Sequence, residues 1–173
     1  MENGHKPGTM PEEFCGGLGE SGARALKEFA AGGGTLVFLN DATAYATEKL
    51  GIQAADVLKG VSNREFYSPG SLLNVELDNR HPLALGLPRE ITIWSEGSSA
   101  WDAAAGTAVA RYPQSGILAS GWLLGDKYLA GRAALLDVPL GKGRAVLFGM
   151  RPQYRAQSYQ TLKLFFNALL DSR

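Results

Sequence analysis

The chain has 173 residues, 45% of them hydrophobic and 20% charged, and its 17 basic residues are balanced by 17 acidic ones. This length suits one domain with a single core, and the composition argues against a disordered chain. A net charge of zero leaves no field to attract nucleic acid, and no run approaches the ~18 apolar residues of a membrane span. We therefore expect neither nucleic acid nor a membrane as a partner.

The N-terminal residues 1–13 are polar and aperiodic, which predicts a tail or linker, and residues 14–173 then form a single domain. The first periodic segment is 18–31, where apolar residues recur at helical spacing opposite charged ones. This pattern predicts a helix whose apolar face consists of Leu18, Ala25, Leu26 and Phe29.

A helix–strand–helix unit follows from the next segments. Glycines 32–34 end the first helix, because glycine accepts the left-handed conformation found at helix C-termini. The uniformly apolar run 35–39 predicts a strand buried on both faces. Asn40 and Asp41 are cap candidates for a second helix that runs to about Leu50.

The second half of the chain predicts a sheet and one further helix. Glycines 141 and 143 flank Lys142 between two apolar runs, which indicates a hairpin. The strand candidates are 71–77, 91–94, 107–112, 117–125, 133–140 and 144–150. Ser158 can cap a final helix whose predicted apolar stripe is Leu162, Phe165, Phe166, Leu169 and Leu170. The predicted fold class is α/β, a mixed sheet of the flavodoxin-like or Rossmann-like kind with helices packed on it.

Three stretches, 10–40, 81–88 and 129–170, together resemble a known family. It is the glutamine-amidotransferase-like domain found C-terminal to the catalytic domain in some bacterial zinc carboxypeptidase-like proteins. The resemblance covers nearly the whole chain. It implies a doubly wound, flavodoxin-like sheet with a less regular second half, a peptidase domain as partner, and a periplasmic or extracellular parent protein.

The resemblance also implies a departure, because domains of this kind begin with additional strands ahead of the helix at 18–31. Here that position holds only the polar tail. The N-terminal strands are therefore missing from the sequence pattern, and the sheet is expected to leave one edge uncovered. Since an uncovered apolar edge associates readily, we expect either self-association or an upstream segment that completes the sheet.

Neither a cysteine nucleophile nor a metal site is well supported by the residues. Amidotransferases use a cysteine on a tight strand-to-helix turn beside a histidine base. Residues 10–14, which precede Cys15, carry a proline and two acids and do not resemble a buried strand. His5 and His81 are the two histidines, and each lacks the nearby acidic partner of a zinc-peptidase site. We expect no catalytic residue, no metal and no cofactor.

The segment after the last strand is the best binding candidate. Arg151, Gln153, Tyr154 and Arg155 lie between that strand and the final helix, where ligands bind in open α/β sheets. Two guanidiniums beside a helix N-terminus could hold a small anion, such as a carboxylate. The structural alternative is that they pair with Asp126, Asp137 or Glu96.

Two other groups have a structural and a functional interpretation. His81 precedes a proline, which favours an extended turn residue over a ligand. Aromatic residues in a sheet are more often core than pocket lining, and those concerned are Trp94, Trp101, Trp122, Tyr67 and Tyr112.

Three functional hypotheses follow. The leading one is a non-catalytic accessory or interaction domain, attached to a zinc carboxypeptidase-like enzyme. The second is a small-molecule or peptide-carboxylate binding domain that uses Arg151 and Arg155. The third is a cysteine-dependent amidase or hydrolase that acts through Cys15.

Overall fold

The structure, a computed structural model, describes residues 4–102 and 106–171. In this part of the chain a nine-stranded mixed sheet is ordered β1-β9-β8-β6-β3-β4, and the short strands β2, β5 and β7 pair at its sides. The strands are β1 Thr35–Leu39, β2 Ala55–Asp56, β3 Pro69–Leu77, β4 Glu90–Glu96, β5 Trp101–Asp102, β6 Thr107–Arg111, β7 Leu118–Ser120, β8 Ala133–Leu140 and β9 Gly143–Phe148.

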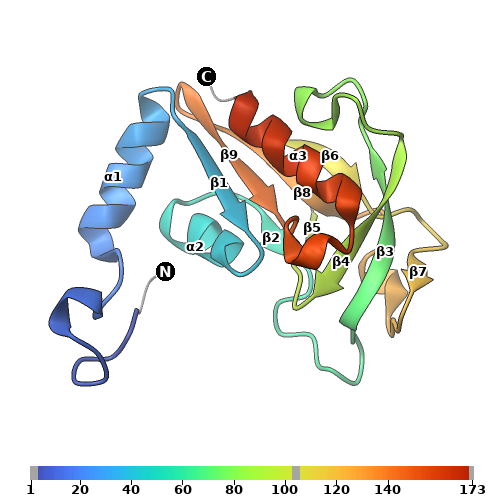
Figure 1. Cartoon of the computed structure of the whole chain (residues 1–173), viewed down its shortest axis with the longest axis horizontal. Coiled ribbons are helices and arrows are strands. Elements are labelled where there is room, and N and C mark those ends of the chain that lie inside the picture. The colour runs from blue at the N-terminus through green and yellow to red at the C-terminus, as the bar shows by residue number, and fades with distance from the viewer. Residues whose placement is uncertain (1–3, 103–105, 172–173) are drawn as a thin grey trace.

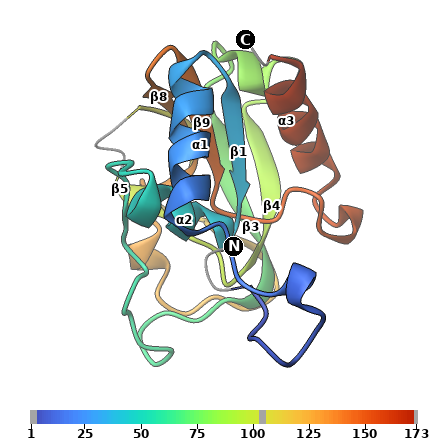
Figure 2. The ribbon, with the colours of Figure 1, turned by 90° about the vertical axis from the view of Figure 1, so that its left-hand side faces the viewer.

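Three α-helices cover the sheet. They are α1 Gly19–Ala31, α2 Ala42–Lys49 and α3 Tyr159–Leu170, and short 3₁₀ turns are η1 Glu12–Phe14, η2 Pro82–Ala84, η3 Asp126–Tyr128 and η4 Tyr154–Ala156. Helices α1 and α2 lie on one side of β1, and α3 lies on the other (Figure 2). No helix in the described ranges is both long and apolar enough to cross a membrane.

The predicted α/β class is confirmed, and the arrangement is consistent with a flavodoxin-like fold. The doubly wound parallel order is confined to one pair, since β1 runs parallel to β9 and the other described pairings of named strands are antiparallel. One of these antiparallel pairs, β8 with β9, is consecutive in the chain and needs only a tight turn. Gly141 and Lys142 form such a turn between β8 and β9, as the sequence predicts.

The core consists of two clusters, one on each face of the sheet. Along β9, Val146 and Phe148 face the cluster beneath α3, while Ala145 and Leu147 face the cluster beneath α1 and α2. This alternation is the two-residue period of a strand. All four side chains are fully buried, so β9 forms the centre of the packing, with helices on both of its faces (Figure 1).

The predicted apolar faces of two helices are partly wrong. On α1 the buried positions are Ala23 and Ala30, with Leu26 beside them, whereas Phe29 and Leu18 are exposed. The buried face of α1 is rotated from the predicted one because the small alanines allow the helix to pack closely on the sheet. On α3 the inward positions are Thr161, Leu164 and Ala168, and the predicted Phe166, Leu169 and Leu170 are exposed.

The predicted strand 117–125 is also too long. Only Leu118–Ser120 pairs in the sheet, as β7. Gly121 follows with a φ of +103°, a conformation that a strand does not contain. The rest of the segment is a loop, and it carries an exposed Trp122.

Buried Tyr112 gives a testable dependence of stability on pH. Burial raises the pKa of its phenol above the ordinary value of 10.0, and the Asp56 carboxylate raises it further. As pH rises, the folded state therefore keeps the phenol proton longer than the unfolded state does. The contribution of the protonated phenol to stability is complete below pH about 10 and is lost as pH rises above it.

We expect the free energy of unfolding to fall above pH about 10 by up to about 1.4 kcal/mol per pH unit through this group. Urea titrations over a pH series measure it. Tyr112→Phe should flatten that slope, and Tyr159→Phe, at an exposed position, should not. Equal slopes in the two variants would contradict the assignment.

Candidate functional site

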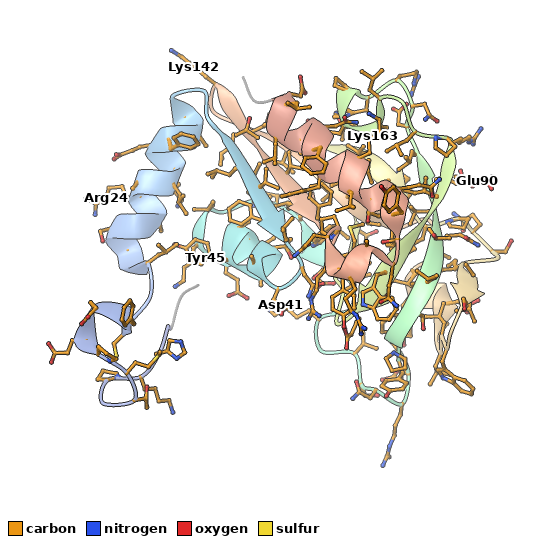
Figure 3. The ribbon with its side chains drawn as sticks, viewed as in Figure 1. Arg24, Asp41, Tyr45, Glu90, Lys142 and Lys163 are labelled. Carbon is orange, nitrogen blue, oxygen red and sulfur yellow. The ribbon has the colours of Figure 1, made fainter. Side chains whose placement is uncertain are left out.

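The carboxyl ends of β1 and β9 meet at one end of the sheet, because these two strands run parallel. At this end β1 leads into α2, and β9 leads through the segment 149–158 into α3. Asp41 and Tyr45, on the chain that leaves β1, lie at this end of the molecule (Figure 3). Ligands of open α/β folds bind at such a place, so this region is the candidate site.

Asn40 occupies the sharp turn between β1 and α2, with a φ of +48°. Its main-chain N–H donates to the Phe148 carbonyl at 2.8 Å, and its carbonyl accepts from Thr43 N–H at 2.9 Å. Its side-chain amide donates to Asp41 Oδ1 at 2.9 Å, so it caps no helical N–H as the sequence had suggested. The Asn40 Oδ1 atom is buried and accepts no hydrogen bond within the described residues. Asn40 is thus a strained turn residue that sequence reasoning treated only as a cap.

Arg151 is paired rather than free. Its guanidinium donates to Glu96 Oε2 at 3.2 Å, which is one of the three partners that the sequence suggested. Tyr154 stacks on Trp94 with ring centroids 5.1 Å apart and an interplanar angle of 15°, and Arg151 lies 5.6 Å from the Tyr154 ring centre. The contacts among these four residues hold the segment after β9 against the end of β4.

Arg155 and Gln153 are the other two residues of the predicted binding segment, and their side chains are exposed. Arg155 and the following Ala156 have φ values of +49° and +52°, a left-handed conformation that non-glycine residues adopt at a cost. The predicted cap, Ser158, bonds through its hydroxyl to the Thr161 hydroxyl at 2.9 Å and caps no helical N–H.

Cys15 lies in the N-terminal segment ahead of α1, away from the end of the sheet just described. Its thiol lies 3.5 Å from the carbonyl oxygens of Lys6 and Met10 and 3.6 Å from that of Pro11. The backbone of His5 bridges to Cys15, yet the contacts described for Sγ are all with carbonyls. The two core clusters begin only at Ala23. The boundary drawn between residues 13 and 14 stays a prediction.

A buried ionic network connects four elements that the sequence did not bring together. Arg144 of β9 donates to Asp137 Oδ2 of β8 at 3.0 Å and forms an ion pair with Asp171, after α3, at 2.9 Å. His81, at the start of η2, has Nε2 3.3 Å from the same Asp137 oxygen. The side chains of Arg144, Asp137 and His81 are only 10%, 12% and 15% exposed. No motif in the sequence indicates this network, because its members lie far apart along the chain, from His81 to Asp171.

His81 is the turn residue that the sequence predicts. Its backbone is extended (φ −79°, ψ 135°) ahead of Pro82, and its Nδ1 accepts from Leu83 N–H at 3.3 Å. Because Nδ1 is an acceptor, the ring proton resides on Nε2 and points to Asp137. Both ring nitrogens are therefore used in holding the turn.

The aromatic residues do not form one pocket. Trp101 and Tyr112 are fully buried in opposite core clusters, Trp94 stacks on Tyr154, and Trp122 and Tyr67 are exposed. Among the described residues no group of three or more His, Cys, Asp or Glu side chains could hold a metal ion.

Comparisons with known proteins do not identify a family for this chain. No protein-family model and no curated protein matches the chain. Among solved structures it is similar to a Bacteroides uniformis protein described as ThuA-like, with a TM-score of 0.48 and 14% identity over 86% of this chain. The chain covers 62% of the length of that protein. At this level the likeness carries no argument about function.

The two arginine pairs give contrasting predictions. Arg144→Met removes the partner of a buried carboxylate and should destabilise the fold by about 3 to 5 kcal/mol. Arg151→Met breaks a pair whose side chains are 35% and 39% exposed, and it should cost below about 1 kcal/mol. Chemical denaturation of both variants measures the difference, and equal losses would contradict the distinction between them.

Proposed function

We propose that the chain is a non-catalytic, amidotransferase-like α/β domain that acts as an accessory or interaction module. The resemblance of its sequence suggests a zinc carboxypeptidase-like protein as its setting. The proposal rests mainly on one observation, which is that Asn40 occupies the turn between β1 and α2.

This position matters because of what such a turn does in enzymes. A strained turn between a buried strand and a helix lifts one side chain above the sheet, and hydrolases of this design place their nucleophile there. The Asn40 carboxamide is not a nucleophile, since its nitrogen lone pair is delocalised into the carbonyl. Its N–H groups are donors, and one already bonds Asp41. The turn thus has the backbone strain of a reactive position without a group that reacts.

The other groups considered for catalysis support the same conclusion. A nucleophile needs a base within hydrogen-bond reach. The Cys15 thiol contacts backbone carbonyls, and both ring nitrogens of His81 hold structural contacts. Arg151, which could stabilise an oxyanion, is neutralised by Glu96.

An assay for two hydrolytic activities tests this proposal. We expect no ammonia release from glutamine above the buffer rate, and no release of a C-terminal amino acid from a peptide with zinc added. Cys15→Ala should behave as the parent chain does, and circular dichroism confirms that both are folded. Turnover that Cys15→Ala abolishes would overturn the proposal in favour of the cysteine-dependent hydrolase.

A second candidate is binding of a small carboxylate by the segment 151–155. The left-handed backbone at Arg155 and Ala156 favours it, because strain of this kind persists where a position serves a purpose beyond folding. The exposed Arg155 follows Tyr154 in the chain, and the Tyr154 ring stacks on Trp94. A carboxylate would bond Arg155 and pack against this aromatic pair.

Titration with a short peptide, followed by NMR shifts of the amides of 151–158, tests the second candidate. Arg155→Ala should weaken binding at least about tenfold, the equivalent of one charge-assisted hydrogen bond. Arg111→Ala serves as the matched control, since Arg111 lies on β6 and bonds the Gly131 carbonyl. Absence of shifts, or equal losses in both variants, would exclude carboxylate binding here.

A further inference from the structure

Two cavities meet at the end of the sheet where β4 stops, and together they form one groove. The first, of about 330 Å³, lies between α2, the segment 56–59 and the loop that follows β4. The second, of about 480 Å³, lies between the segment 58–69 and the same loop. Leu58, Gly97 and Ser98 line both cavities, so one extended ligand can occupy the two. Cavities of this size are typical of binding sites.

The first cavity has a negatively charged lining. Asp41, Glu48 and Asp56 contribute carboxylates, and Lys59 contributes an ammonium group. Lys59 bonds Glu48 at 2.8 Å, so these two charges offset each other. The carboxylates of Asp41 and Asp56 form no ion pair within the described ranges, and the cavity therefore favours a cation.

Asp56 is held in position by the main chain. Its Oδ1 atom accepts from Leu58 N–H at 3.0 Å and from Ala100 N–H at 3.3 Å. Its Oδ2 atom accepts no hydrogen bond from any described residue. Because an ionised carboxylate accepts through both oxygens, the fixed Asp56 side chain keeps one oxygen available to a donor on a ligand.

The polar groups around Asp41 add further acceptors. Thr43 donates its hydroxyl proton to the Asn40 carbonyl at 2.6 Å, which leaves the hydroxyl oxygen as an acceptor. Thr47 does the same with the Ala44 carbonyl at 3.0 Å. The neighbouring Asn40 bonds Asp41 through its amide, and its buried Oδ1 atom has no donor in the described part of the chain. Acceptors are thus in excess here, and a ligand rich in N–H donors matches them.

A metal ion matches these acceptors less well than an organic cation does. Among the described residues no three His, Cys, Asp or Glu side chains come close enough together to hold a metal. Ca²⁺ and Mg²⁺ need about six oxygen ligands. An ammonium or guanidinium group needs only one or two carboxylates, because its hydrogen bonds to them are charge-assisted.

The second cavity adds fixed apolar surface. Phe66 packs edge-to-face on Tyr128, with ring centroids 6.4 Å apart. Tyr67 exchanges two main-chain hydrogen bonds with Leu124, and its side chain is 43% exposed. Because both aromatic residues are held before a ligand arrives, little ordering is needed on binding. The carboxylate of this cavity, Glu96, is already paired with Arg151.

We propose that this groove binds a peptide segment that places an arginine or lysine side chain in the first cavity and an apolar side chain in the second. This inference rests on the proposed function, since it names the kind of partner that the interaction module takes. The cationic side chain bonds Asp56 and Asp41, and the apolar one packs against Phe66 and Tyr67. Charge complementarity selects the basic residue, and the junction of the two cavities selects an extended chain.

The probes are capped peptides in which zero, one or two alanines separate an arginine from a phenylalanine, beginning with acetyl-Arg-Phe-amide. Their amide ends cannot use the carboxylate site considered at Arg155. We expect binding to shift the NMR signals of the amides of 41–48, 56–59 and 97–99. Glutamine in place of the arginine should weaken binding at least about tenfold, the equivalent of one charge-assisted hydrogen bond. Alanine in place of the phenylalanine should weaken it about tenfold, through the apolar surface that is no longer buried.

Asp56→Asn tests the charge without removing the oxygen that bonds Leu58 and Ala100. It should weaken binding of the arginine peptide at least about tenfold and leave that of the glutamine peptide unchanged. Glu90→Gln is the matched control, because it removes one negative charge at the other end of β4 from Glu96. It should bind the arginine peptide as the parent chain does. Figure 3 shows Glu90 well away from Asp41.

Several results would overturn this proposal. They are equal binding of the arginine and glutamine peptides, equal losses in the two variants, shifts confined to 151–158, and no binding of any probe. Butylammonium that binds as tightly as the peptides would show a site for a small amine and would also overturn it. Each of these results leaves the absence of hydrolysis standing. Cleavage of a probe by the parent chain but not by Cys15→Ala would overturn the proposed function and leave the groove standing.

Discussion

The whole arrangement depends on β9, which is buried on both faces and paired along both edges. Its alternate side chains belong to opposite core clusters, so α3 is held on one face and α1 and α2 on the other. Arg144, near its start, fixes Asp137 and Asp171, and Phe148, at its end, accepts from Asn40. Burying these apolar faces contributes roughly 25 cal/mol for each Å² removed from water, which explains why a strand without polar side chains beyond Arg144 can organise the domain.

The polar residues that suggest chemistry are mostly bound to other parts of the fold. His81 and Asp137 join the turn before η2 to the sheet, and Arg151 with Glu96 joins the last connection to β4. The buried group around Asp137 costs desolvation energy but favours one geometry when its partners are all in place, whereas the half-exposed pair of Arg151 and Glu96 contributes little. The role of these pairs is therefore to hold parts of the chain in place. The exceptions are the strained turns at Asn40 and Arg155, one of which lacks a reactive group while the other presents an exposed cation.

Local patterns in the sequence were sufficient for the α/β class, the hairpin at 141–143 and the three helices, because each depends on residues close in the chain. The aromatic residues, the ionic network and the helix faces depend on which strands become neighbours, and no local pattern records that. Phe29 and Leu169 show the difference clearly. Hydrophobic periodicity predicted that both are buried, whereas they are exposed beside β1.

Amide hydrogen exchange on β1, measured by NMR in dilute protein, tests most directly whether this strand is held through β9 along one edge. In dilute protein, the amides of Leu36 and Phe38 should exchange slowly, because they bond β9, and those of Thr35, Val37 and Leu39 should exchange fast. Equal protection of the five amides would contradict the account, because β1 would then have a second neighbour besides β9.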